Sequence, residues 1–250
     1  MTLLGYAQRQ QTKEAKYKGV LTWLKHYTWT HMDVLQVLLG LKRRTLQATL
    51  SRMERDGLIK GAMIQVSYAR PIKLWGLTHH GLHHCSDPGE PLGPRAVFDP
   101  KKVAPSRLVH ELDVQLVHVR AQRAGWKAWK PAALIAEPLV AKGLTVPDAV
   151  AITATGETVA LELERTLKSS KRYQEILVSY LQGRKLGLWQ RVLYLSPDAT
   201  TAARIERAFR SIKTARFQGE AFTVQPAHLA PFAFLSYDAL FPPSTPVLRE

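Results

Sequence analysis

The chain has 250 residues, which is long enough for two small domains, and its hydrophobic content of 46% is sufficient for buried cores. Thirty-five Lys and Arg residues against twenty Asp and Glu residues give a formal net charge of +15, which favours a polyanionic partner such as nucleic acid or an anionic membrane surface. The single cysteine excludes an intramolecular disulfide and a cysteine-based zinc finger. No apolar run approaches the roughly 18–20 residues of a membrane span, and the N-terminal segment lacks the apolar core of a signal peptide. We therefore expect a soluble, cytoplasmic protein that binds a polyanion.

The basic surplus is concentrated near the N-terminus. Residues 1–80 carry a net charge of +9, whereas residues 81–146 and 147–250 each carry +3. Residues 81–106 contain five prolines and three glycines without a period, which predicts an interdomain linker. The predicted organisation is an N-terminal domain over 1–84, a linker over 85–106, a C-terminal domain over 107–216 and a C-terminal extension over 217–250.

The first domain is predicted to contain three helices followed by a β-hairpin. Apolar residues at helical spacing predict helices over 12–27, 30–40 and 42–57, with Thr30 as the cap of the second. Two β-rich runs, 58–66 and 72–78, flank a predicted turn at 68–71. This order is typical of a winged helix. The segments RRTLQATLSRMERDGLIKG and KLWGLTHHG resemble the recognition helix and the returning wing strand of winged-helix regulators.

Polar and basic side chains of the third predicted helix point away from its apolar stripe. Arg and Gln can contact base edges through two hydrogen bonds, and Thr can hold a phosphate. The hairpin adds two basic residues where wings usually touch the DNA backbone. The predicted DNA-binding residues of this domain are Arg43, Arg44, Thr45, Gln47, Arg52, Lys60 and Arg70. A merely solvated basic helix face is the alternative, and the N-terminal charge excess favours double-stranded DNA as the partner.

The second domain is predicted to be a layered α/β domain with a short mixed sheet. Its pattern predicts a helix over 107–124 and strands over 128–135, 146–153 and 157–165, then a helix over 169–182, a strand over 190–195 and a helix over 200–213. The extension from residue 217 is rich in aromatic residues and proline. It is expected to be an extended arm that packs on this chain or on a partner.

Three carboxylates are predicted to converge on one face of this sheet. Residues 153–157 fit a three-residue hairpin loop with Gly156 in the left-handed region, which places Asp148 opposite Glu162. Glu164, two residues along the strand, points to the same face. Neighbouring carboxylates repel one another unless a cation neutralises them, and oxygen ligands suit Mg²⁺ or Mn²⁺. The pattern indicates metal-assisted phosphodiester chemistry, with a solvent-facing acidic strand as the alternative.

These residues also carry a family resemblance. The dipeptide at 147–148, the hairpin and the Glu-Leu-Glu at 162–164 resemble the PD-(D/E)XK nuclease core, and the flanking helices and strand follow the order of that core. Together with the winged helix, segment 147–180 is similar to the replication-relaxation proteins and MobC-type relaxases of plasmids and integrative elements. The resemblance implies a winged helix joined to a restriction-endonuclease-like α/β domain. It implies a relaxase that nicks one DNA strand at an origin of transfer.

The resemblance also implies roles for individual residues. Asp148 and Glu162 would be the ligands of Mg²⁺ or Mn²⁺. Glu164 stands where the core motif usually has lysine, and Lys168 early in the next helix could restore a positive charge beside the phosphate. Glu111 lies on the helix predicted over 107–124, where some such nucleases add a carboxylate ligand.

Three other groups of residues carry chemistry. Lys171 and Arg172 begin the helix after the acidic strand and could hold a backbone phosphate, unless that helix start is simply solvated. Tyr173 and Tyr180 lie on one face of the same helix, but no histidine triad accompanies them, so a covalent tyrosine mechanism is not favoured. The segment THHGLHHC, residues 78–85, offers zinc ligands, although its spacing matches no standard structural site.

The main functional prediction is therefore a metal-dependent endonuclease of plasmid or integrative-element mobilisation. The alternative is a non-catalytic DNA-binding accessory or regulatory protein of conjugative transfer or plasmid replication, in which the nuclease-like sheet binds another transfer or replication protein. Glu164 in the lysine position keeps this alternative open. A transcriptional or copy-number regulator would explain the winged helix but not the carboxylates.

Overall fold

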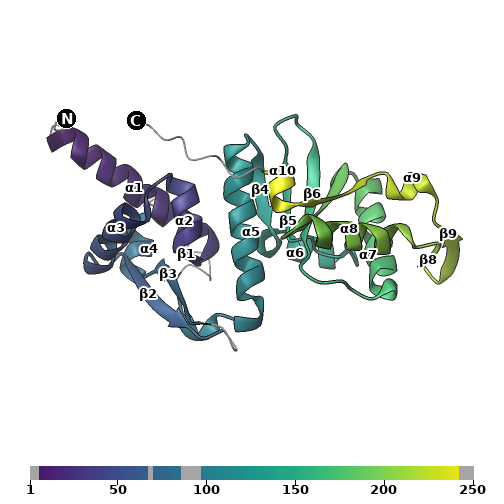
Figure 1. Cartoon of the computed structure of the whole chain (residues 1–250), viewed down its shortest axis with the longest axis horizontal. Helices are drawn as coiled ribbons and strands as arrows, with labels where there is room; N and C mark the ends of the chain where they lie inside the picture. The colour runs from purple at the N-terminus through teal and green to yellow at the C-terminus, as the bar shows by residue number, and fades with distance from the viewer. Residues whose placement is uncertain (1–5, 67–69, 86–96, 242–250) are drawn as a thin grey trace. The chain divides into compact units, whose positions relative to one another are not determined.

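A computed structural model describes residues 6–66, 70–85 and 97–241. The chain divides into two compact units, Met1–Val119 and Arg120–Glu250, and the division falls inside helix α5 (Pro105–Arg123; Figure 1). Among the helices that the structure describes, none is both long and apolar enough to span a bilayer.

The N-terminal unit contains helices on both faces of a three-stranded antiparallel sheet with strand order β1-β3-β2. Its elements are α1 (Tyr6–Tyr27), β1 (Trp29–His31), α2 (Met32–Leu39), α3 (Arg43–Arg55), β2 (Ile59–Ile64), β3 (Ile72–Leu77), α4 (His79–Cys85), a short 3-10 helix (Pro100–Lys102) and most of α5 (Pro105–Arg123). The three predicted helices and the hairpin are thus confirmed, and their order with this strand pairing is that of a winged helix.

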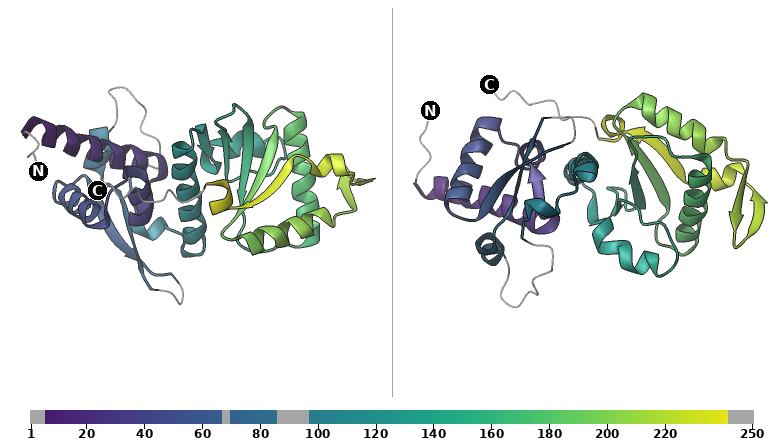
Figure 2. Two further views of the ribbon diagram at one scale, coloured as in Figure 1. Left: turned by 45° about the horizontal axis from the view of Figure 1, so that its top comes forward. Right: turned by 90° about the horizontal axis from the view of Figure 1, so that it is seen from below.

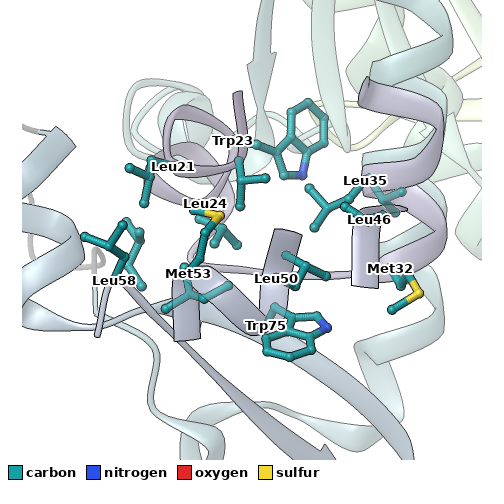
Figure 3. Close-up of a cluster of buried hydrophobic side chains, with 14 of the residues drawn as sticks. Leu21, Trp23, Leu24, Met32, Leu35, Leu46, Leu50, Met53, Leu58 and Trp75 are labelled. Carbon is teal, nitrogen blue, oxygen red and sulfur yellow. The ribbon is translucent and has the colours of Figure 1, made fainter. Parts of the chain in front are cut away.

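The main core of this unit lies between the helices and one face of the sheet (Figure 3). Leu24 of α1, Leu35 of α2 and Leu50 of α3 are fully buried there against Trp75 of β3. Apolar residues recur at helical spacing along each helix, so one side of each helix is buried. In α3 this leaves the opposite side exposed to solvent.

Two local details of this unit differ from the predictions. His31, and not Thr30, caps α2, because Thr30 is buried in the added strand β1, where its hydroxyl accepts a hydrogen bond from Trp23 Nε1 at 3.3 Å. Helix α4 was not predicted. It packs against the start of β2, where Gly81 is required because a Cβ there would lie 1.8 Å from the Leu58 carbonyl oxygen.

Part of the segment predicted as a linker belongs to the N-terminal unit. Phe98 is fully buried and Val103 is 7% exposed, and both pack against Ile64 and Leu74 on the second face of the hairpin. The other half of that prediction, residues 86–96, lies outside the described residues. The proline-rich composition favoured a linker, but the apolar side chains within it are buried by the sheet.

The C-terminal unit is built on a five-stranded mixed sheet with strand order β10-β7-β6-β5-β4. Strands β4, β5 and β6 form an antiparallel meander, and β6, β7 and β10 run parallel. Helices α7 and α8 pack on one face of this sheet (Figure 2). They share an aromatic core there that includes Tyr173, Tyr180 and Phe209. The elements after α5 are β4 (Lys127–Pro131), α6 (Ala132–Val140), β5 (Ala149–Ile152), β6 (Thr158–Leu163), α7 (Ser170–Lys185), β7 (Arg191–Ser196), α8 (Ala199–Arg210), β8 (Thr214–Phe217), β9 (Glu220–Thr223), α9 (Pro226–Leu229), β10 (Phe232–Ser236) and α10 (Tyr237–Leu240).

The predicted mixed sheet of this α/β unit is confirmed, but two segments differ from the prediction. The strand predicted over 128–135 ends at Pro131, and the following AALIA sequence continues as helix α6. The C-terminal extension, predicted as an extended arm that packs on this chain or on a partner, contributes β10 to the sheet of its own unit, where β10 pairs with β7 as a parallel edge strand. Phe232 of β10 packs against Phe209 of α8 with 5.0 Å between ring centroids, which explains why this apolar segment joins the core.

Candidate nucleic-acid interface

Helix α3 presents an exposed and largely polar surface. Its four buried residues, Leu46, Thr49, Leu50 and Met53, lie on one side of the helix, as the sequence predicted for three of them. All five residues of α3 that were predicted to bind DNA are exposed: Arg43, Arg44, Thr45, Gln47 and Arg52.

The outermost stripe of α3 also contains a residue that the sequence analysis missed. Arg44, Ala48, Ser51 and Arg55 follow one another at spacings of four, three and four residues, directly opposite the buried stripe. Arg55 is exposed, and its Nε donates to the Ser51 carbonyl oxygen at 3.4 Å. The same helical spacing from Arg44 could have identified it.

Within the part of the chain that the structure describes, Arg43 is the arginine of α3 that forms an ion pair with an acidic side chain. Its guanidinium lies 3.2 Å from Asp33 of α2, and both side chains are about two-thirds exposed. An exposed pair of this kind contributes little stability, so Arg43 can exchange its carboxylate for a phosphate.

The hairpin places its basic residues on two different faces. Lys73, which the sequence analysis missed, lies on the same face as Trp75 and the helices, with its ammonium 4.0 Å from the Trp75 ring centroid. Lys60 lies on the opposite face, 5.9 Å from the ring centroid of Phe98. Arg70 is exposed where the chain enters β3, directly after residues outside the described part.

The predicted carboxylate register is present in the C-terminal unit. Thr153 N–H donates to the Glu157 carbonyl oxygen at 2.9 Å, Gly156 has a φ of 89°, and Ala149 pairs with Leu161. The pairing ends there, and the same register continued by one position places Asp148, the residue before β5, opposite Glu162. In addition, Asp148 Oδ2 accepts a 2.7 Å hydrogen bond from the Leu163 backbone N–H, which holds this carboxylate at the end of β6.

The two glutamates are buried and have internal partners. Glu162 is 8% exposed and accepts the hydroxyl proton of Tyr180 at Oε1, while Glu164 is 6% exposed and forms an ion pair with Lys168. Burial, followed by the charge of Glu162, raises the pKa of Tyr180 well above its ordinary value. Tyr180 thus stays protonated and acts as a hydrogen-bond donor, which the sequence analysis did not foresee.

The other predicted residues around the carboxylates occupy separate positions. Lys171 is exposed at the start of α7, and Arg172 is exposed with its guanidinium 3.1 Å from Glu175. Glu111 lies in the N-terminal unit, 3.7 Å from Arg107, and burial raises its pKa. Its assignment to the carboxylate group stays a prediction.

The structure offers a limited donor set for metals. Within the residues that it describes, no three His, Cys, Asp or Glu side chains are grouped to hold an ion. The histidine-rich segment is covered by this statement. Its residues 79–85 form α4, in which the ring centroids of His80 and His84 lie 6.4 Å apart.

No protein-family model and no curated protein matches the sequence. Two solved structures are similar to about a third of the chain. A transcriptional regulator homologue from Pyrococcus horikoshii OT3 is 20% identical with a TM-score of 0.26, covering 31% of this chain and 80% of its own. The C30AH42A mutant of Lactococcus lactis ZitR is 16% identical with a TM-score of 0.26, covering 32% of this chain and 58% of its own. The winged-helix assignment of the N-terminal unit rests on the element order and strand pairing of this chain itself.

Proposed function

We propose that the chain is a DNA-binding protein whose N-terminal winged-helix unit contacts duplex DNA with helix α3. The observation that carries this proposal is the exposed stripe through Arg44 and Arg55, flanked by Gln47 and Arg52, on a helix whose other side is fixed in the core. An α-helix fits the major groove, where Arg and Gln can distinguish base pairs through paired hydrogen bonds. With the resemblance of segment 147–180 to replication-relaxation proteins, the proposed role is a DNA-binding accessory or regulatory protein of conjugative transfer or plasmid replication.

Replacement of Arg44 and Arg55 by alanine is expected to weaken DNA binding by about ten- to a hundredfold, since each lost contact costs on the order of 1 kcal/mol. The slope of log affinity against log salt should fall by about 2, because two fewer phosphate counterions are released. Fluorescence anisotropy with a mixed-sequence duplex at several salt concentrations measures both quantities. Lys127→Ala with Lys142→Ala is the matched control, because it removes two exposed charges from the C-terminal unit. Equal binding by all three proteins would contradict the assignment of α3.

A second candidate function is metal-dependent cleavage of one DNA strand, as in a relaxase acting at an origin of transfer. The position of Asp148 opposite Glu162, with Lys168 beside Glu164, favours it. Mg²⁺ commonly uses only one or two protein carboxylates and takes its other ligands from water and substrate phosphate. Asp148 and Glu162 fit that requirement and would hold the ion, which when bound would activate water and neutralise charge on the phosphate.

Under this second proposal, Tyr180 orients Glu162 through its hydroxyl, Asp148 is oriented by the Leu163 N–H, and Lys168 keeps the carboxylate of Glu164 neutralised. Lys171 and Arg172 at the start of α7 would bind a flanking phosphate, helped by the N-terminus of this sixteen-residue helix.

Asp148→Asn is expected to abolish nicking of a supercoiled plasmid that carries the element's transfer region, while DNA affinity stays the same or rises slightly. Asparagine keeps an oxygen acceptor for the Leu163 N–H and removes only the charge, so the fold should persist. Conversion to open circles is followed with Mg²⁺, Mn²⁺ or EDTA, with Glu220→Gln on the exposed surface of β9 as the control. Retained nicking in Asp148→Asn would exclude this site. Absence of nicking by the wild-type protein would exclude the second candidate and leave DNA binding in place.

A further inference from the structure

We propose that the turn Pro100–Lys102, which we call the basic turn, is a second contact for the DNA backbone on the side of the wing that faces away from α3. This inference rests on the proposed DNA-binding function and specifies how far the DNA contact extends. It assigns a role to a segment that composition alone identifies as linker.

The basic turn is fixed to the back of the hairpin by buried apolar residues on both of its sides. Phe98 precedes it with no exposed surface, and its N–H donates to the Leu77 carbonyl oxygen at 2.9 Å. Gly76 makes room for it, because a Cβ at that position would lie 2.2 Å from the Cβ of Phe98. Val103 follows the turn and is 7% exposed in the same cluster as Ile64. The segment is therefore a built part of the winged-helix unit.

The backbone of the turn is also held by its own cap. The Asp99 carboxylate accepts a hydrogen bond from the Lys101 N–H at 3.0 Å, and the Val103 N–H donates to the Pro100 carbonyl oxygen at 3.3 Å. The carboxylate of Asp99 is thus directed at the backbone, while the side chains of Lys101 and Lys102 are exposed. A rigid turn that presents two ammonium groups loses little backbone entropy when it binds a phosphate.

The charge around the basic turn is predominantly positive. Lys60 lies over the ring of Phe98, and Arg107, two-thirds exposed, begins the next helix. Two acidic side chains near the turn have partners of their own, since Asp99 caps the turn and Glu111 pairs with Arg107. Positive charge therefore exceeds negative charge on this face of the wing.

The wing sheet carries basic residues on both of its faces. This arrangement suits contact with the two phosphate backbones that border a minor groove. Side chains alternate between faces, so Lys73 lies with Trp75 on the α3 side, while Lys60 and the basic turn lie on the other side. The minor groove is about 6 Å wide, with a phosphate backbone along each edge. The sheet with the layer of Phe98 behind it is wider than the groove, so a wing that lies over the groove brings one face toward each backbone. Lys73 then contacts one backbone, and Lys101 with Lys102 contacts the other.

The test is Lys101→Ala with Lys102→Ala in the full chain. We expect affinity for a mixed-sequence duplex to fall about five- to tenfold and the salt slope to fall by about 2. The ranking of different duplex sequences should not change, because backbone contacts carry no direct sequence information. Lys101→Arg with Lys102→Arg should restore binding. Both lysines are exposed, so the thermal unfolding midpoint should stay unchanged, and Lys127→Ala with Lys142→Ala is the charge-matched control.

Hydroxyl-radical footprinting provides the strand-specific readout. The wild-type protein should protect both backbones that border one minor groove, and the variant should lose protection on one of them. If affinity, salt slope and footprint are unchanged while Arg44→Ala with Arg55→Ala still weakens binding, the basic turn is not a DNA contact and the proposed function stands. If neither pair of substitutions affects binding, both proposals are wrong.

Discussion

Replacement of Phe98 by alanine is expected to lower the free energy of unfolding of the N-terminal unit by about 3–5 kcal/mol, the cost of truncating a fully buried phenylalanine. Phe98 has no exposed surface and packs with Trp29, Leu74 and Leu108, so its removal leaves a cavity between the hairpin and α5. A residue in a free linker would show almost no effect.

This loss can be measured in the full chain by native-state hydrogen exchange, read from peptides of β2 and β3. Phe217→Ala is the control, because Phe217 is 41% exposed on β8 of the other unit. We expect the control to change stability by no more than about 0.5 kcal/mol. A change for Phe98→Ala as small as that of the control would show that residues 97–103 do not belong to the folded unit.

The stability of the N-terminal unit is expected to fall as the pH drops below about 6.5. Burial, followed by the proximity of His26, lowers the pKa of His118 from 6.5 to about 3. His118 is 4% exposed, and its Nδ1 lies 2.8 Å from the Tyr27 hydroxyl. Between these two pKa values the unfolded chain binds a proton that the folded chain does not. The contribution of His118 is thus complete above pH 6.5 and is lost at a rate on the order of 1.4 kcal/mol per pH unit as the pH approaches 3.

His118→Gln is the variant that isolates this effect, because its amide can still partner the Tyr27 hydroxyl but does not titrate. Both proteins are unfolded by urea at pH 7, 6 and 5, and unfolding is monitored by hydrogen exchange of α1 peptides. The free energy of unfolding should depend less steeply on pH in the variant. Burial also lowers the pKa values of His26 and His31, so part of the slope should persist. Identical slopes for the two proteins would exclude His118 as a determinant.

The exposed surface of α3 and the carboxylate register were both predictable because they depend on local sequence. The apolar stripe of α3 follows from the helical period alone, so the exposed residues on its opposite side could be identified from the sequence. The register of Asp148 and Glu162 follows from the short hairpin loop with Gly156, since a loop of defined length determines which residues face each other.

The partner of Glu162 could not be predicted, because it comes from another element. Tyr180 reaches Glu162 from α7, which packs across the sheet, and its buried hydroxyl gives no signal in the sequence. Lys73 and the basic turn were missed for the same reason. Their position depends on which face of the wing each side chain occupies and on the docking of Phe98.

The sequence by itself determined the three helices and the hairpin of the first domain, the strands β5, β6 and β7 with helices α7 and α8, the concentration of positive charge in the first third and the stripe of α3 that can meet DNA. These properties are set by periodicity, turn residues and composition, which act over a few residues. Only the tertiary structure decided that residues 97–103 join the winged helix and that β10 completes the C-terminal sheet beside β7. Both depend on burial of apolar side chains against segments distant in the chain, where the free energy of packing overrides local composition.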